Sequence, residues 1–373
     1  MVDLRSQYGR IKNEIGSAIT NVLDRASFIQ GPEVQQFADA LGKYINCPYT
    51  IPCANGTDAL QIAMMSLELK PGDEIIVPVH TYVATAEVIA LLGLRPVFVD
   101  VYDTSFNMNV DQIEQKITSR TKAIVPVHLY GQCADMEPLL SVAGKYRLYV
   151  IEDAAQALGA EYTFSDGSTR FAGTMGTIGT TSFFPSKNLG CYGDGGAVFT
   201  SDAVLAEKMK TIANHGQRIK YQHDMIGINS RLDTLQAAIL IVKLKYLNEF
   251  TITRRRVADF YDEAFRSLPF LIIPSRSSNS THVFHQYTLK IKDGHRDRFK
   301  VYLENNGIPT MIYYPTPLHL QKAYRSPDSP VGSFPVTEEL SATVISLPIH
   351  TEMSLDELNY ISGVVKNFRE YGC

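Results

Sequence analysis

The sequence predicts an α/β protein: a mostly parallel central sheet flanked by helices, followed by a smaller carboxyl-terminal α+β domain. Between residues 74 and 153, short β-rich runs alternate with helical patterns of about ten to fifteen residues. These runs are almost continuous in apolar residues, as parallel strands buried on both faces are. Beyond residue 280 this rhythm gives way to one strand pattern and one helix pattern, which is typical of a small α+β domain.

Each element of the larger domain has its own signal. Amphipathic helices are predicted over residues 8–24 and 33–45, and the GPE sequence at 31–33 is interpreted as the turn between them. The predicted strands are YTIPC (49–53), EIIVPV (74–79), RPVFVDV (95–101), KAIVPVHL (122–129) and RLYVIED (147–153).

A change of texture after Asn229 predicts the domain boundary. Residues 231–268 carry an apolar stripe opposite a charged face, which indicates a connecting helix. A strand over 283–292, a helix over 295–306 and a Pro/Ser-rich loop over 326–336 follow it. We therefore expect a large domain over residues 1–240 and a small domain over 241–373.

Composition excludes several classes of partner and site. A formal net charge of -4 over 373 residues gives no basic excess that would attract nucleic acid. Five cysteines without a Cys-x-x-Cys pair argue against a disulfide framework and a structural zinc site, and the histidines match no zinc spacing, so we expect no metal. The charged amino terminus and the lack of an apolar run of membrane length predict a cytoplasmic protein without a membrane segment.

One lysine stands in an unusual setting. In SFFPSKNLGCYGDGGA (182–197), Lys187 has apolar bulk on one side and a glycine-rich run on the other. That setting suits an amine with a lowered pKa that attacks a carbonyl carbon, although a snorkelling surface lysine fits the same letters. Ser182 could donate its hydroxyl to a phosphate. The run GTMGTIG (173–179) lacks the G-x-G-x-x-G spacing and is interpreted as the turn into the strand before Ser182.

Three further positions follow predicted strands, where ligands bind in parallel α/β sheets. Gly56 and Thr57, in NGTDAL (55–60), open a helix whose free N–H groups could bind a phosphate, or the motif is a plain helix cap. Asp153 could pair with a protonated ring nitrogen, or cap the next helix. Tyr82 could stack on a planar ring, or belong to the core.

Taken together, the motifs resemble the sugar aminotransferase family called DegT/DnrJ/EryC1/StrS. The resemblance runs from about residue 3 to about residue 370, in the family's order. It rests on NGTDAL, HTYVATAE (80–87), EDAAQALGA (152–160), SFFPSKNLGCYGDGGA, GINSRLDTLQAAIL (227–240) and YYPTPLHLQKAY (313–324). It implies the aspartate-aminotransferase fold and the cofactor pyridoxal 5'-phosphate (PLP).

The resemblance also implies a role for each matching position. Lys187 would bind PLP covalently and then carry the proton during catalysis, and Asp153 would pair with the pyridine nitrogen. The other implied cofactor contacts are Gln156 at the ring hydroxyl, Tyr82 on the ring face, Gly56, Thr57 and Ser182 at the phosphate, and Asn229 from the other subunit of a homodimer. The implied substrate contacts are Arg231, Tyr314 and His319.

The expected reaction moves an amino group from glutamate to a nucleotide-linked keto sugar. Cys191 and Tyr192 after the lysine make the sequence most similar to members that aminate UDP-2-acetamido-2-deoxy-3-oxo-glucuronate for surface polysaccharide. Arg231 could pair with the carboxylate of that sugar, form a structural ion pair with Asp233, or contact the carboxylate of the amino donor. The alternatives are a dTDP-keto-hexose 3- or 4-aminotransferase and a non-catalytic regulator or sensor that keeps the PLP fold.

Overall fold

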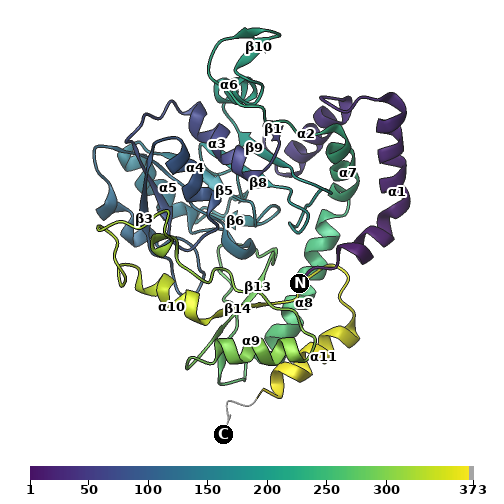
Figure 1. Cartoon of the computed structure of the whole chain (residues 1–373), viewed down its shortest axis with the longest axis vertical. Helices are drawn as coiled ribbons and strands as arrows, with labels where there is room; N and C mark the ends of the chain where they lie inside the picture. Colours follow the sequence, from purple (N-terminus) through teal and green to yellow (C-terminus); the bar gives the residue numbers. More distant parts are fainter. Residues whose placement is uncertain (369–373) are drawn as a thin grey trace.

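A seven-stranded sheet forms the centre of the computed structural model, which describes residues 1–368 (Figure 1). Its strand order is β1-β9-β8-β5-β4-β2-β3. The strands are β1 (Tyr49–Cys53), β2 (Glu74–Pro78), β3 (Arg95–Val99), β4 (Thr121–Ile124), β5 (Tyr149–Asp153), β8 (Ile178–Ser182) and β9 (Gly196–Thr200). β9 runs antiparallel to both of its neighbours, and the pairs from β8 to β3 are parallel. The predicted α/β class with a mostly parallel sheet is confirmed.

Helices cover both faces of this sheet. Ile75 and Val77 of β2 pack into one buried cluster, whereas Ile76 between them packs into another. Successive strand residues point to opposite faces, so apolar residues at all three positions need a helical layer on each side. The helices of this part are α1 (Leu4–Arg25), α2 (Pro32–Tyr44), α3 (Gly56–Ser66), α4 (Ala84–Leu91), α5 (Met136–Tyr146), α6 (Ala203–Ala213) and α7 (Thr234–Leu244).

The single connecting helix predicted over 231–268 is wrong in its continuity. The chain forms α7 and then α8 (Leu247–Phe265), with the break at Lys245 and Tyr246. The two helices serve different layers: α7 packs against α1 and α2, and α8 packs against the carboxyl-terminal helix α11 (Leu355–Lys366). One apolar stripe could not face both layers along a straight axis.

A second, smaller core surrounds α8. It contains the antiparallel sheet β12–β13–β14 and aromatic residues such as Tyr261, Phe265 and Phe299. The strand predicted from residue 283 begins only at Tyr287, because Phe284 takes a left-handed φ of 46° that interrupts extended backbone. The remaining elements here are β12 (Leu271–Ile272), β13 (Tyr287–Ile291), α9 (Arg296–Asn305), α10 (Pro335–Thr343) and β14 (Val344–Leu347). The predicted domain boundary at 240/241 falls inside α7 and stays a prediction.

A buried carboxylate ties this smaller part to the main sheet. Asp100 directly follows β3 and accepts hydrogen bonds from the backbone N–H groups of Val336 and Thr337, both at 3.0 Å, in the first turn of α10. Lys290 of β13 adds an ion pair to Asp103 at 2.9 Å. Both contacts lie beyond the carboxyl end of a sheet strand, so they place α10 and β13 close to the edge where a ligand site is expected.

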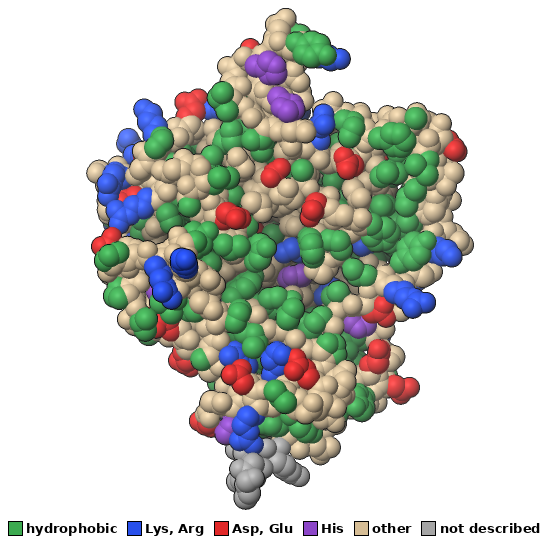
Figure 2. Space-filling view, viewed as in Figure 1, with side chains coloured by type: hydrophobic (Ala, Val, Ile, Leu, Met, Phe, Trp, Pro, Cys, Tyr) green, Lys and Arg blue, Asp and Glu red, His purple; other side chains and the backbone are tan. Residues whose placement is uncertain are grey.

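A short hairpin projects from the large part of the molecule. It consists of β10 (Gln217–Ile219) and β11 (Gln222–His223), at the top of Figures 1 and 2. Apolar side chains in and after the hairpin are strongly exposed, Tyr221 by 80% and Ile226 by 85%. Among the helices of residues 1–368, none combines the length and apolar character needed to cross a bilayer.

Candidate active site

The amino terminus of α3 is open to an anion. Asn55 caps the helix by accepting a hydrogen bond from the N–H of Asp58 at 2.8 Å, and the first bond within the helix runs from Ala59 to Asn55. The N–H groups of Gly56 and Thr57 therefore lie before the hydrogen-bonded part of the helix, where the helix dipole is positive. The cap and the anion site proposed from NGTDAL are thus compatible in one structure.

Gly56 and Ser182 lie directly against each other. A Cβ atom on Gly56 would lie 2.7 Å from the Cβ of Ser182, closer than two carbon atoms can approach. A Cβ on Gly196 would likewise lie 2.4 Å from the carbonyl oxygen of Asn55. Glycine at both positions lets the start of α3 pack on the ends of β8 and β9. The Ser182 hydroxyl, which accepts from Phe184 N–H at 3.2 Å, is thereby brought beside the free helix N–H groups.

The segment that carries Lys187 is a closed loop. The backbone N–H of Cys191 donates to the Phe183 carbonyl at 2.8 Å, and the Asn188 amide donates to the Val283 carbonyl at 2.9 Å. Lys187 is half-buried, and removal from water lowers the pKa of its amine to about 8, while the nearby charge of Asp153 acts to raise it. The loop thus presents an amine with a sizeable neutral fraction close to a carboxylate.

Asp153 is the last residue of β5 and is 7% exposed. Its carboxylate accepts hydrogen bonds from the Thr85 hydroxyl at 2.9 Å and from the Ala155 N–H at 3.1 Å. Two donors fix the orientation of the carboxylate and stabilise its charged form. Asp153 can therefore serve as a fixed negative charge at the sheet edge.

Gln156 and three tyrosines form the wall beside this carboxylate. The Gln156 carbonyl oxygen accepts from the Tyr130 N–H at 2.7 Å, and its amide donates to the Tyr314 hydroxyl at 3.2 Å. The rings of Tyr82 and Tyr314 are 6.2 Å apart, and Tyr82 is 58% exposed. Tyr82 is therefore not a core residue, and its ring is available to stack on a ligand.

These groups match the chemistry of PLP. The cofactor needs an amine for its aldehyde, a carboxylate for its pyridine nitrogen and N–H or hydroxyl donors for its phosphate. We call the N–H groups at the start of α3 and the adjacent Ser182 hydroxyl the phosphate cradle. Gly56 packs so closely on Ser182 that even a methyl side chain at position 56 would clash, which keeps the two donors side by side. Asn188 Oδ1, next to Lys187 in the sequence, is buried without a partner among residues 1–368. His80 Nδ1 is buried and unpartnered in the same way, with its ring 6.0 Å from that of Tyr314.

Three predicted site residues make none of the contacts described above around Lys187 and Asp153. Asn229 is exposed and pairs with Asn214, and Arg231 lines a separate cavity of about 370 Å³. His319 has no exposed surface, and its Nε2 lies 3.1 Å from Glu338 Oε1, so the structure offers no atom of His319 to a substrate. Asn229 is exposed and Arg231 is half-buried, and the roles of both stay predictions.

Thr85 and Tyr130 are contacts that the sequence analysis missed. Thr85 lies in the quoted motif HTYVATAE, three residues after Tyr82, a spacing that brings it to the carboxylate once α4 has formed. Tyr130 follows the end of the fourth predicted strand, which is where a search of strand ends could have found it. His285 also lies close enough to Lys187 for the lysine charge to act on it, although burial is the main reason that its pKa is low.

Comparisons with known proteins agree with this site. The model of the DegT/DnrJ/EryC1/StrS aminotransferase family matches residues 9–366. The chain is 43% identical to the UDP-2-acetamido-2-deoxy-3-oxo-D-glucuronate aminotransferase of Pseudomonas aeruginosa, over 98% of this chain and 99% of the relative. It is 42% identical to a pleiotropic regulatory protein of Geobacillus stearothermophilus, over 99% of this chain and 98% of the relative. NtdA from Bacillus subtilis, solved with the cofactor PMP, matches with a TM-score of 0.86 and 33% identity, over 95% of this chain and 82% of that one.

The chain belongs to the DegT/DnrJ/EryC1/StrS aminotransferase family. The predicted family, fold and enzyme class, an aminotransferase that uses PLP, are thereby confirmed.

Substitution of Gly56 by alanine should weaken cofactor binding. The new Cβ would push α3 away from Ser182, and we expect PLP affinity to fall roughly tenfold or more, because the phosphate would lose donors. Fluorescence titration of the cofactor-free protein with PLP measures this. Gly144→Ala in α5, where a Cβ would meet nothing within 4 Å, is the control and should leave the affinity unchanged. Equal PLP affinities in the two variants would contradict phosphate binding at the start of α3.

Substitution of Lys187 by methionine should stabilise the cofactor-free protein in a pH-dependent way. The folded wild type has a Lys187 pKa of about 8, below the ordinary 10.5 of the unfolded chain. Between the two pKa values, from about pH 8 to about pH 10.5, the folded state has released a proton that the unfolded state keeps, so the contribution of Lys187 to wild-type stability rises with pH. In urea unfolding, the variant should have a larger free energy of unfolding than the wild type at pH 7, and this difference should be smaller at pH 9. A constant difference would show that the amine is not held out of water.

Proposed function

We propose that this protein transfers an amino group from glutamate to the 3-keto group of UDP-2-acetamido-2-deoxy-3-oxo-glucuronate, as a step in making surface polysaccharide. The observation that carries the proposal is the amine of Lys187 held close to the Asp153 carboxylate, beside the phosphate cradle at Gly56. The choice of sugar is supported by the relative that is 43% identical over nearly the whole length of both chains.

The protein side of the reaction follows from the side chains present. PLP, when bound, supplies a protonated pyridine ring that accepts the electron pair left when a C–H bond breaks. Asp153, fixed by Thr85, favours the protonated ring nitrogen by its negative charge. Lys187, with a pKa of about 8, takes and returns the proton, because near neutral pH it can hold either form.

The other cofactor contacts are positional. The free N–H groups at Gly56 and Thr57 and the Ser182 hydroxyl would hold the phosphate, and Tyr82 would cover one face of the ring. Gln156 keeps one amide hydrogen that is not used by Tyr314, and this hydrogen is available to the ring hydroxyl.

The proposal includes a homodimer whose subunits complete each other's sites. Asn229 and Arg231 lie apart from the Lys187 loop, and the exposed apolar hairpin next to them is the kind of surface that a partner covers. In this arrangement the Asn229 amide donates a hydrogen bond to the phosphate of the cofactor bound in the other subunit. Arg231 forms no ion pair with Asp233 in the described part of the chain, which leaves its guanidinium available for the sugar carboxylate. A cytoplasmic location completes the proposal.

One relative favours a second candidate. The protein of Geobacillus stearothermophilus is named as a regulator, so a sensor that binds PLP without turnover is the alternative from another class. Lys187, Asp153 and Gln156 are all present and brought together here, which a non-catalytic protein does not require.

The substrate proposal predicts a change in cofactor absorbance with the right amino sugar. The reverse reaction, with the UDP-linked 3-amino sugar acid and 2-oxoglutarate, should convert the lysine-bound cofactor to its amine form and yield glutamate. The Lys187→Ala variant should fold and show no turnover, a loss of at least roughly a thousandfold, because the base and the attachment point are removed.

The competing outcomes of this assay are distinct. Faster turnover of a dTDP-linked 3- or 4-amino sugar would replace the proposed substrate with the rival one. A stable cofactor band with every amino sugar and with glutamate would favour the sensor, and normal turnover by Lys187→Ala would falsify the assignment.

Mixed dimers test the shared site. Lys187→Ala and Asn229→Ala should each be impaired, but co-expressed chains should form dimers in which one site is intact. Purified mixed dimers should then have roughly half of the wild-type activity, because one of their two sites is intact. If Asn229 acts within its own subunit, no mixture can be more active than the separate variants allow. The measurement is turnover of tag-purified mixed dimers against each variant alone.

A further inference from the structure

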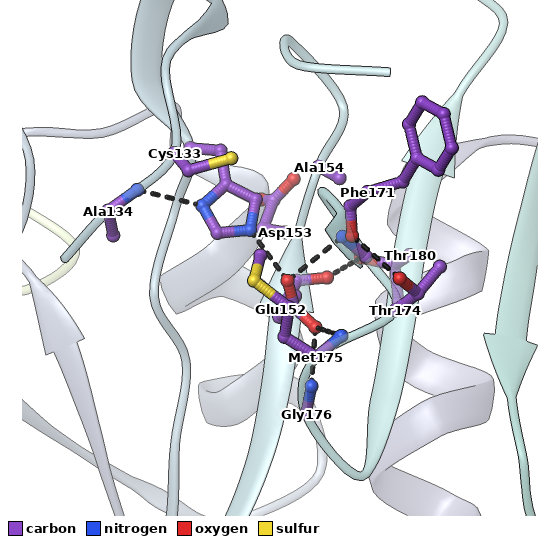
Figure 3. A network of polar contacts seen from close by, with 12 residues as sticks. Cys133, Ala134, Glu152, Asp153, Ala154, Phe171, Thr174, Met175, Gly176 and Thr180 are labelled. Atoms are coloured by element: carbon purple, nitrogen blue, oxygen red, sulfur yellow. Dashed lines mark hydrogen bonds and ion pairs between the residues drawn. The ribbon is translucent and has the colours of Figure 1, made fainter. Parts of the chain in front are cut away.

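Glu152 is a charged residue in the core that the reaction does not use. It precedes Asp153 in β5 and has no exposed surface. One carboxylate oxygen accepts from the backbone N–H groups of Met175 at 2.6 Å and Gly176 at 2.5 Å. The other oxygen accepts from the Gly173 N–H at 2.9 Å, so the loop over residues 173–176 supplies three donors to the carboxylate (Figure 3). Burying a carboxylate costs free energy unless hydrogen bonds satisfy it, so a buried carboxylate held by several donors calls for an explanation.

His128 supplies the fourth hydrogen bond. It is fully buried, and its Nε2 lies 2.8 Å from Glu152 Oε2. Its Nδ1 accepts from the Ala134 N–H at 3.0 Å, so the ring proton is on Nε2 and points at Glu152. Each oxygen of Glu152 thus accepts two hydrogen bonds. Three of the donors are backbone N–H groups, which cannot accept, and His128 could accept at Nε2 only by losing the bond from Ala134.

This network holds the backbone of Asp153 from the far face of the sheet. Side chains of successive strand residues point to opposite faces, so Glu152 lies behind the site that Asp153 enters. The His128 N–H donates to the Asp153 carbonyl at 3.0 Å, and the Thr180 hydroxyl donates to the Glu152 carbonyl at 3.0 Å. The peptide groups on both sides of Asp153 are therefore fixed by residues joined to Glu152.

The same segment reaches the second cofactor contact. Two residues after His128, the Tyr130 N–H donates to the Gln156 carbonyl oxygen at 2.7 Å. His128 thus links Glu152 to the groups that would face the pyridine nitrogen and the ring hydroxyl. The run GTMGTIG, interpreted from sequence as a turn, holds Glu152 from the other side, because its backbone N–H groups donate hydrogen bonds to the carboxylate.

We propose that Glu152, locked by His128 and the 173–176 loop, is a positioning residue that sets where the Asp153 carboxylate meets the ring nitrogen of PLP. The inference rests on the proposed function. It goes beyond a structural anchor, because a shift of Asp153 changes how strongly the ring nitrogen is kept protonated, and that change is visible in the titration of the bound cofactor.

Glu152→Gln tests the proposal with almost no change of shape. Whichever way the glutamine amide turns, its NH₂ group faces two N–H donors, so those two donors lose their hydrogen-bond acceptor. We expect PLP affinity to fall roughly tenfold, and the pKa of the lysine-bound cofactor, followed by absorbance, to move by about half a unit or more.

Glu74→Gln is the matched control. Glu74 is equally buried, at 2% exposure, and is bonded to Thr118 and Arg120, but it begins β2 at the opposite edge of the sheet. Its variant should be less stable in urea, whereas its PLP affinity and its cofactor pKa should match the wild type. Both substitutions remove a buried charge, but only Glu152 adjoins Asp153, so a change in cofactor binding in Glu152→Gln alone is not a general effect of losing a buried charge.

The outcomes separate the inference from the proposed function. A folded Glu152→Gln with affinity within about twofold of wild type and an unmoved cofactor pKa overturns the positioning role. If Glu152→Gln does not fold, His128→Phe, which removes the His128 donor to Glu152 and the acceptor of the Ala134 N–H, carries the same test: PLP affinity should fall and the cofactor pKa should move relative to the wild type. A wild-type protein without a lysine-bound cofactor band would overturn the proposed function, and the inference with it.

Discussion

A lysine amine held out of water close to a carboxylate is the interaction on which the site depends. Burial lowers the pKa of Lys187 to about 8, and Asp153 limits the fall. An isolated buried ammonium would be costly, and an amine in bulk water would be almost fully protonated at neutral pH. The intermediate setting gives a group that can attack a carbonyl and also move a proton, which an aminotransferase requires of one residue.

The rest of the large domain supports this pair by bringing strand ends together. Asp153 ends β5, Ser182 ends β8 and Gly56 begins the helix after β1, so three separate strands deliver three functions to one edge. The close packing of Gly56 on Ser182 excludes any larger residue, and Asp100 joins α10 to the same edge. The smaller core around α8 is thereby held near the cofactor site, where Tyr314 reaches Gln156.

Two charged side chains in the core are each held by several hydrogen bonds. Glu152 is saturated by four hydrogen bonds, and Arg254 of α8 is held by the carbonyl groups of Phe284 and Ile349, both at 3.1 Å. Such groups add little net stability compared with apolar packing, but each fixes a backbone segment in one position. In this protein the fixed segments are those next to Asp153 and His285, which lie at the site.

The sequence by itself predicted the strands β1 to β5 and a lysine suited to attack a carbonyl, because apolar runs and a lysine between apolar and glycine-rich stretches are local signals; the cofactor class came from the resemblance of the ordered motifs to a family, and β9 was not predicted. It could not show that 231–268 is two helices, that Phe284 delays β13, or that His319 is enclosed with Glu338. Those features depend on which layer each segment packs against. The partners of Asp153 and Glu152 come from residues up to 68 positions away in the chain, so only the tertiary structure decided them.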